Sequence, residues 1–411
     1  MIAILSIGDE LILGEIVDTN SATLSALLYD NGMMVKEHAT VGDDETAIIE
    51  ALKRLSKDYK TIVVTGGLGP TTDDITAEAA AKAAGQNVAL NEEALKHLDD
   101  YAKRAQRILH PINRRQAMLP EKAGIIPNPQ GTACGFIVTL NGSSMFFLPG
   151  VPSEMLKMFK ATVLPYIMKQ RQETDIYQTV TMTTFGAPES ELGAMLQQVI
   201  LPENITLAYC VNFPSIFVKL RGKGADPNIL SSEMEKATQN VKDILGELVV
   251  TEGDSTIDTI VAELFRKTGA TLALAESCTG GLISKRITDI PGSSEYFLQG
   301  AVTYSNGSKE RLLGIPGHIL ESYGAVSHET AEKMAIGIRE SAGSDIGVSV
   351  TGIAGPDGGA EEKPVGTVFI ALADKKGCTV ERCKFRGNRD AIRNMTSYKA
   401  LDIIRRHLLS Y

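Results

Sequence analysis

Residues 61–74 read TIVVTGGLGPTTDD, in which a run of β-branched residues leads directly into a glycine-rich turn. The same order recurs upstream, where IAILSIG at 2–8 and MVKEHATVG at 34–42 are strand-like. Helical patterns run from Asn20 to Asn31 and onward from Glu45. Strands that alternate with helices predict a mostly parallel α/β sheet covered on both faces. Ligands of such sheets bind at the carboxyl ends of the strands, which is where this segment has its Gly and Asp residues.

The pattern continues to about residue 170, with MFFLPG at 145–150 and a helix from Ser153. The opening MIAILSIGDELILGEIV is apolar, but Asp9, Glu10 and Glu15 interrupt it and no basic residues precede it. It is therefore interpreted as a buried first strand and not as a signal peptide.

Composition limits the class of protein. The 411 residues are enough for two to three domains of about 100–200 residues each. Hydrophobic residues make up 43% and charged residues 22%, which is typical of globular proteins. The net charge of −9 disfavours nucleic acid as a partner. No apolar run reaches the roughly 18 residues of a membrane span, so we expect no membrane association.

Five cysteines are scattered along the chain without a CxxC pair. This usage predicts a cytoplasmic protein and argues against both a disulfide framework and structural zinc. The pattern of strands and helices predicts three domains, at 1–170, 171–252 and 253–411. The middle one reads βαββαβ, the order of a small α+β sandwich of ferredoxin-like or KH-like type, and contains no catalytic cluster.

The last domain contains a strand, TLALA, that runs directly into 276–281 (ESCTGG), after which LISKRITDI is helical. Ser277 therefore lies at a strand-to-helix corner, where free N–H groups and the positive end of a helix converge. Such a corner can present a nucleophile and hold an oxyanion, with donors from Thr279 to Gly281. Alternatively, Ser277 is only the N-cap of the helix and the glycines only shape a turn.

A second corner is formed by AVTYSNGSKERLLG, which places Tyr304, Asn306 and Lys309 near the start of a helix. Burial and the helix dipole both favour a neutral amine at Lys309, and a serine beside a neutral lysine is a known pair of nucleophile and base. Alternatively, Lys309 is a solvated surface lysine and Tyr304 a core residue. Cys278 is the rival nucleophile. A third turn, VTGIAGPDGG at 350–359, has glycines that allow close approach of a ligand to the backbone.

The motifs AESCTGGL, VTYSNxxK, GAVS (324–327), TGIAGPDGG and KPVGTV together resemble the C-terminal domain of the CinA family, the nicotinamide mononucleotide deamidases. The resemblance implies hydrolysis of nicotinamide mononucleotide to nicotinate mononucleotide and ammonia, without a cofactor. It makes Ser277 the nucleophile, Lys309 its base and Tyr304 a proton relay or orienting residue. The substrate contacts that it implies are Thr279, Gly280, Gly281, Asn306, Thr351, Gly352, Gly355, Arg389 and, more weakly, Arg393.

In the first domain, the glycines of TGGLGP and a helix expected from about Thr72 can hold a phosphate. Asp73 and Asp74 would lie in the first turn of that helix, where acids are ordinarily stabilising. Beside a bound diphosphate the same acids would repel it unless a cation lay between, which suggests Mg²⁺ or a similar hard metal.

The motifs GDELILG (8–14), DTN (18–20), VGDD (41–44), TGGLGPTTDD (65–74), NPQGTACG (128–135) and LPGVPSEM (148–155) resemble the molybdopterin-binding fold, in the version found at the N-terminus of CinA proteins. The resemblance implies an ADP-ribose diphosphatase that needs a divalent metal (Mg, Mn or Co) and yields AMP and ribose 5-phosphate. The candidate metal ligands are Asp9, Asp73, Asp74 and Glu154, and the candidate substrate contacts are Gly66, Gly67, Gly69, Thr71 and Asp43, the last also a possible metal or catalytic group.

Two other hypotheses remain open at this point. The first domain could bind a pterin or nucleotide without turning it over, or the chain could be an accessory protein for competence or recombination that acts through protein contacts. In either case the middle domain is expected to act as a spacer and to contribute to a homodimer.

Overall fold

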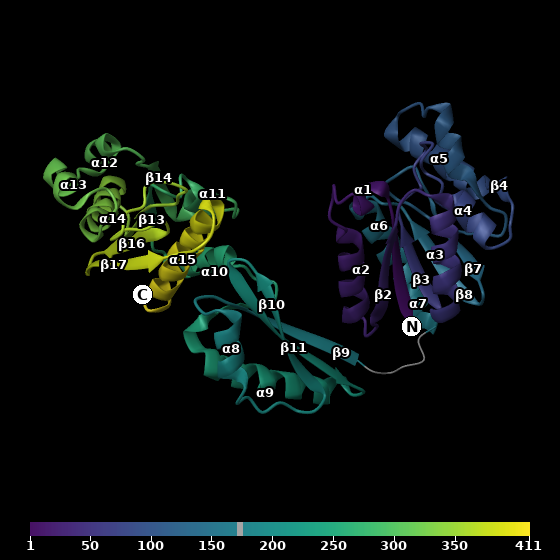
Figure 1. The fold of residues 1–411 in the computed structure, drawn as a ribbon, viewed down its shortest axis with the longest axis horizontal. Coiled ribbons are helices and arrows are strands. Elements are labelled where there is room, and N and C mark those ends of the chain that lie inside the picture. The colour runs from purple at the N-terminus through teal and green to yellow at the C-terminus, as the bar shows by residue number, and fades with distance from the viewer. Residues whose placement is uncertain (171–175) are drawn as a thin grey trace. The chain divides into compact units, whose positions relative to one another are not determined.

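A computed structural model describes residues 1–170 and 176–411 (Figure 1). The chain divides into two compact units, Met1–Thr179 with Gly222–Glu233 and Val180–Arg221 with Met234–Tyr411, so the middle domain contributes to both. No helix within the described ranges is both long and apolar enough to cross a membrane.

The first domain is built on a six-stranded sheet, as the alternation of strands and helices predicts. Its order is β2 (Val35–Val41), β1 (Ile2–Ile7), β3 (Thr61–Thr65), β8 (Ser143–Leu148), β7 (Gly135–Leu140) and β6 (Gly124–Ile126). The first four strands are parallel and the last two antiparallel. The smaller β4 (Val88–Leu90) and β5 (Met118–Pro120) pair separately.

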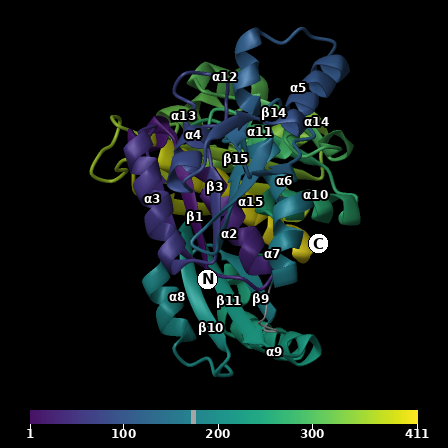
Figure 2. The ribbon, with the colours of Figure 1, turned by 90° about the vertical axis from the view of Figure 1, so that its right-hand side faces the viewer.

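Helices cover both faces of this sheet (Figures 1 and 2). Side chains of β3 alternate between two cores: Ile62 and Val64 pack with α3 (Glu45–Asp58) and α4 (Thr76–Ala83), and Val63 packs with α2 (Thr19–Asp30) and α6 (Pro152–Met158). The remaining helices are α1 (Asp9–Ile12), α5 (Glu92–Ala105) and α7 (Leu164–Gln170).

Two boundaries differ from the sequence prediction. The first strand ends at Ile7 and gives way to the short helix α1, because Gly8 turns the chain and its N–H bonds to Val41 O. The helix after TGGLGP begins at Thr76 and not at Thr72. Asp73 and Asp74 therefore lie in the loop before the helix and not in its first turn, and the predicted place for these two acids was wrong.

The middle domain has the predicted βαββαβ order. Its elements are β9 (Ile176–Thr184), α8 (Glu189–Leu196), β10 (Ile205–Asn212), β11 (Ser215–Gly224), α9 (Pro227–Leu245) and β12 (Val249–Glu252). The sheet order β10-β11-β9-β12 is that of a ferredoxin-like split βαβ fold.

The last domain has a five-stranded sheet in the order β14 (Phe297–Val302), β13 (Leu272–Glu276), β15 (Ile346–Gly352), β16 (Thr367–Asp374) and β17 (Gly377–Lys384). Its first three strands are parallel. The helices are α10 (Ile257–Thr268), α11 (Leu282–Thr288), α12 (Asn306–Leu313), α13 (Gly317–Tyr323), α14 (His328–Ala342) and α15 (Arg389–Leu409). On β13, Leu272 and Leu274 belong to one core while Ala273 and Ala275 belong to another, so this strand is buried on both faces.

Candidate functional site

The carboxyl ends of the three parallel strands of the last domain bring the predicted catalytic residues together. Ser277 directly follows β13, and its N–H donates to Val350 O on β15 at 3.0 Å. Thr303 follows β14, and its N–H donates to Glu276 O. These two bonds extend the sheet pairing past the strand ends and fix Ser277 beside the segment that leads into α12.

Lys309 reaches this corner from α12, a helix that begins where Ser305 and Ser308 form a capping box. The Nζ atom of Lys309 lies 3.3 Å from Oγ of Ser277. The lysine is 1% exposed, so the interpretation as a solvated surface residue is wrong. Ser277 and Lys309 are 32 positions apart in the sequence. They are nevertheless in contact, because they follow two adjacent parallel strands, which end at the same edge of the sheet.

The Nζ atom of Lys309 lies among three oxygen atoms, Ser277 Oγ, Thr303 O and Tyr304 O, and as a charged group it would donate to all three. Its Nζ donates to Thr303 O at 2.8 Å and to Tyr304 O at 3.4 Å. A neutral amine has two hydrogens and one lone pair, so once Lys309 has lost its proton it can keep these two bonds and accept from the hydroxyl of Ser277. Burial lowers the pKa of Lys309, which favours the form that can accept a proton.

The carboxylate of Glu276 bonds to the N-terminal end of α11, where the sequence analysis had predicted donors for a ligand. This carboxylate is fully buried and accepts hydrogen bonds from Gly281 N, Ile283 N, Ser284 N and Ser284 Oγ. The N-cap of α11 is Gly281, so the interpretation of Ser277 as the N-cap is wrong. The N–H of Gly280 donates to Ser277 O. The N–H groups of Gly280 and Gly281 are therefore already bonded within the protein and do not serve as the predicted anion donors.

Replacing Glu276 by glutamine is expected to lower the free energy of unfolding of this domain by about 2–4 kcal/mol, because one end of an amide cannot accept from donors that face it. The measurement is urea denaturation of the full-length chain. Ser284→Ala removes one of the four bonds and leaves the carboxylate, so it is the mild control. Equal stability of the glutamine variant and the native chain would show that the carboxylate does not hold the turn.

Cys278 does not compete as a nucleophile. The side chain is 6% exposed, and burial raises the pKa of its thiol to about 12. The thiol is therefore protonated at neutral pH, and only the thiolate is reactive. Cys278 also belongs to the apolar core of the last domain.

Two arginines of α15 line the outer side of the corner. Arg389 donates to Gly355 O at 2.7 Å and to the hydroxyl of Tyr304 at 3.0 Å. Arg393 donates to Thr279 O at 2.7 Å. Among the described residues neither arginine forms a salt bridge, so neither positive charge is paired with a carboxylate. Tyr304 is 60% exposed, which rules out the interpretation as a core residue.

The other residues predicted to contact the substrate of this site are Thr351, Gly352 and Asn306. Thr351 is 1% exposed and its hydroxyl donates to Ala325 O, so it joins strand β15 to the loop before α14 and its hydroxyl is not available to a ligand. Gly352 is needed for packing, since a Cβ there would lie 2.7 Å from a methyl group of Val368. Asn306 is exposed at the first position of α12. Its side chain forms no hydrogen bond to the other residues that the structure describes.

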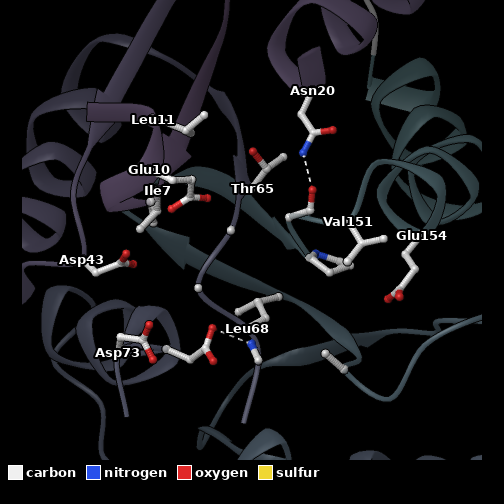
Figure 3. Close-up of a pocket in the computed structure, with 18 of the residues that line it drawn as sticks. Ile7, Glu10, Leu11, Asn20, Asp43, Thr65, Leu68, Asp73, Val151 and Glu154 are labelled. Atoms are coloured by element: carbon white, nitrogen blue, oxygen red, sulfur yellow. Dashed lines mark hydrogen bonds between the residues drawn. The ribbon is translucent and has the colours of Figure 1, made fainter. Parts of the chain in front are cut away.

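The first domain has a cavity of about 460 Å³ at the carboxyl ends of β1, β3 and β8 (Figure 3). Its described lining residues include six carboxylates and no lysine, arginine or histidine, although Arg115 lies close by and donates to Thr71 O. The acids are Glu10, Asp18, Asp43, Asp73, Asp74 and Glu154. A cation would offset the repulsion between these carboxylates and an anionic ligand.

The glycine loop is closed by one of the predicted metal ligands. The carboxylate of Asp74 accepts from Gly69 N at 2.8 Å and from Thr71 N at 2.9 Å. The predicted phosphate contacts at Gly69 and Thr71 are thus bonded to Asp74, and Thr71 does not line the cavity. Gly66 and Gly67 do line it, and a Cβ on Gly66 would lie 2.0 Å from Ile7 O, so only glycine allows this close crossing of β1.

Asp9, another predicted metal ligand, is bonded to the loop that contains Asp43. Its carboxylate accepts from Asp43 N, and its own N–H donates to the carboxylate of Asp43. Asp9 is not among the lining residues, whereas Glu10, which sequence reasoning missed, is. Burial, followed by the charges of Asp9, Glu10 and Asp73, raises the pKa of Asp43. Repulsion among these acids marks the place in the cavity where a cation would be stabilised.

Glu154 lies on another wall of the cavity, on the side of Figure 3 opposite Asp43 and Asp73. Asn128 donates to Glu154 at 2.7 Å, and the absence of a side chain at Gly131 makes room for the carboxylate. Four of the five predicted acids, Asp43, Asp73, Asp74 and Glu154, therefore share one cavity without converging on one point. Within the described ranges, no group of three or more His, Cys, Asp or Glu residues is arranged to hold a metal ion.

Comparisons with known proteins agree with this three-domain architecture. Residues 3–169 match the family described as a probable molybdopterin binding domain, 179–251 the damage-inducible protein CinA KH domain, and 254–408 the CinA C-terminal domain. A CinA-like protein of Geobacter metallireducens is 53% identical over 100% of this chain and 99% of its own, and one of Shewanella sp. is 42% identical over 98% and 94%.

Solved structures are similar to part of the chain. The competence/damage inducible protein CihA of Agrobacterium tumefaciens is 38% identical, covers 37% of this chain and 95% of its own, and has a TM-score of 0.36. The CinA protein of Thermoplasma acidophilum is 34% identical, with coverages of 40% and 96% and a TM-score of 0.37. Since full-length relatives share about half of all residues and each domain matches its own family, the chain belongs to the CinA family.

Proposed function

We propose that the last domain hydrolyses the carboxamide of nicotinamide mononucleotide, giving nicotinate mononucleotide and ammonia. The observation that carries this proposal is the buried amine of Lys309 at 3.3 Å from the hydroxyl of Ser277. A buried lysine with a lowered pKa, positioned against a serine, is an arrangement for nucleophilic catalysis.

The chemistry follows from the proton positions. Lys309 accepts the hydroxyl proton as Oγ of Ser277 bonds to the carboxamide carbon. The carbon–nitrogen bond then breaks, and Lys309 returns the proton so that ammonia departs and an ester on Ser277 remains. Water, deprotonated by the same amine, attacks the ester carbonyl, and the proton goes back to Oγ as nicotinate mononucleotide leaves. No step needs a cofactor.

Arg389 and Arg393 are the groups that we propose for the phosphate of the nucleotide. Both are anchored by bonds to loop carbonyls and have N–H groups left over for an anion. The bond from Arg389 to the hydroxyl of Tyr304 would also orient this tyrosine against the substrate.

For the first domain we propose cleavage of ADP-ribose into AMP and ribose 5-phosphate with a divalent metal. The oxygen donors of the cavity fit a hard cation in chemistry, and the negative charges of Asp9, Glu10 and Asp73 add to burial in raising the pKa of Asp43. Mg²⁺ characteristically binds through one or two carboxylates together with substrate phosphates, so a preformed cluster of three acids is not required. Asp43, Asp73 and Glu10 are the residues that would hold it, and it would polarise the diphosphate and neutralise its charge.

Both activities are tested on one preparation of the full-length chain with and without a metal chelator. Ammonia release from nicotinamide mononucleotide is expected to persist in the chelator, while AMP release from ADP-ribose is expected to stop and to return with Mg²⁺, Mn²⁺ or Co²⁺. Absence of ammonia in both conditions would contradict the deamidase. Tight binding of ADP-ribose without AMP under any metal would favour the alternative that the first domain only binds nucleotides.

Two further expectations belong to this proposal. The five cysteines are all free, which fits a reducing, cytoplasmic compartment. A homodimer, with the middle domain as one of its contacts, is proposed as the working form. Sedimentation at micromolar concentration measures this state directly.

A further inference from the structure

The cavity of the first domain has an exposed apolar edge as well as its acids. Ile16, Val17 and Val151 line the cavity, and they are 54%, 82% and 51% exposed. Single exposed apolar side chains are ordinary on a protein surface, but several at the edge of one cavity are typical of a place that binds an apolar group. These three residues are called the apolar rim.

The two segments that carry the apolar rim are bonded to their surroundings. The N–H of Ile16 donates to Glu10 O at 3.3 Å. In the helix that follows, Nδ2 of Asn20 donates to Gly150 O at 2.8 Å, and Val151 is the next residue of that second segment. The apolar rim is therefore a formed part of the cavity wall and not a loose loop.

The apolar rim extends away from the acids that are proposed to hold the metal. It begins at Ile16, which is bonded to Glu10, and it ends at Val151, on the side of Figure 3 opposite Asp43 and Asp73. Acids and rim line one cavity of about 460 Å³, so a nucleotide with its diphosphate at the acids has the rim beside its other groups.

The chemistry of the ligand decides which of its groups lies on the rim. In a nucleoside diphosphate sugar the diphosphate is charged and the riboses carry hydroxyls, whereas the base has two flat, largely apolar faces. Contact between a base face and aliphatic side chains removes apolar surface from water on both sides. A charged or hydroxylated group there would lose water without gaining a hydrogen bond, because valine and isoleucine side chains have no polar atom.

We propose that the apolar rim binds a face of the base of the bound nucleotide while the acids hold its diphosphate through the metal. This assignment rests on the proposed nucleotide substrate of the domain. It names Ile16 and Val17 as residues that bind the base without taking part in the cleavage.

The test measures binding to the full-length chain by titration calorimetry with Mg²⁺. One ligand is the analogue of ADP-ribose in which CH₂ replaces the bridging oxygen of the diphosphate, so that it is not cleaved, and the other is the same molecule with hydrogen in place of adenine. The native chain is expected to bind the base-free ligand about tenfold more weakly. The double variant Ile16→Ser, Val17→Ser is expected to bind the adenine ligand about tenfold more weakly than the native chain does, and the base-free ligand equally well.

Leu13→Ser is the matched control, since Leu13 is 72% exposed on the same loop and is not among the described lining residues. Its binding of both ligands is expected to equal that of the native chain. Equal weakening of both ligands in the double variant, or no weakening of either, would overturn the assignment. Unchanged binding together with a change in sedimentation would assign the rim to contact with a second copy of the chain and would also overturn it.

Release of AMP from ADP-ribose is measured separately, so binding and cleavage can be told apart. Base-dependent binding that the double variant loses, without release of AMP by the native chain, would support the contact with the base and contradict the diphosphatase. Release of AMP, with equal binding of the adenine ligand by the native chain and the double variant, would do the reverse. If the native chain neither binds the adenine ligand nor releases AMP in the presence of Mg²⁺, both proposals fall.

Discussion

Alanine in place of Ser277 is expected to reduce ammonia release from nicotinamide mononucleotide by about 10⁴-fold or more, because the attacking oxygen is lost. Lys309→Met is expected to cost about 10²–10⁴-fold, since methionine keeps the length of the side chain but cannot accept the proton. The double variant should be little worse than Ser277→Ala, because the two groups act as one unit. The measurement is the initial rate of ammonia formation by the full-length chain.

The candidate site of the first domain supplies the control for these variants. Ser277 and the cavity of the first domain belong to different cores, so ADP-ribose cleavage by Ser277→Ala and Lys309→Met should equal that of the native chain. Ammonia release that survives in Ser277→Ala would show that another group attacks the carboxamide. Loss of both activities in a folded variant would show that the two domains do not act independently.

Asp43→Asn is expected to lower metal-dependent AMP release by about 10²–10³-fold, because the carboxylate at the centre of the acidic cluster would no longer help to bind the cation. Asparagine has nearly the same shape and can still accept from Asp9 N, so the loop should keep its conformation. The measurement is the rate of AMP formation at several Mg²⁺ concentrations. Part of the loss is expected to be recovered at high metal concentration.

Asp9→Asn serves as the comparison. The carboxylate of Asp9 accepts from Asp43 N and does not line the cavity, so this variant should affect stability more than the metal requirement. If Asp9→Asn raised the metal requirement and Asp43→Asn did not, the assignment of the two acids would be reversed.

The strands and helices could be predicted from the sequence because the local pattern of apolar and polar residues determines them. The buried β-branched run at 61–65 and the βαββαβ order of the middle domain correspond to the strands observed. The pair of Ser277 and Lys309 was also accessible, since each follows a strand of a parallel sheet and such strands end at one edge. Contact between two residues that are distant in sequence can be inferred when each lies just after a strand of the same parallel sheet.

Side-chain capping within a loop could not be predicted in this way. Glu276 and Asp74 each turn back onto neighbouring N–H groups, and both take donors that the pattern had left for a ligand. Sequence shows that acids are present near a helix start but not whether the carboxylate folds onto the loop or faces the cavity. For the same reason the sequence did not show that Glu10, and not the adjacent Asp9, lines the cavity.

The central claim, that an uncharged Lys309 activates Ser277, is tested most directly by the pH dependence of kcat/KM for ammonia release, which reports the ionisation of the free enzyme. Burial lowers the pKa of Lys309, so the amine loses its proton at a lower pH than an ordinary lysine. The account predicts that kcat/KM rises with pH and levels off well below about 10.4, the usual value for a lysine side chain, and that Lys309→Met loses this rise. A rate that continues to rise to about pH 10.4, or a profile that is the same in Lys309→Met, would contradict it.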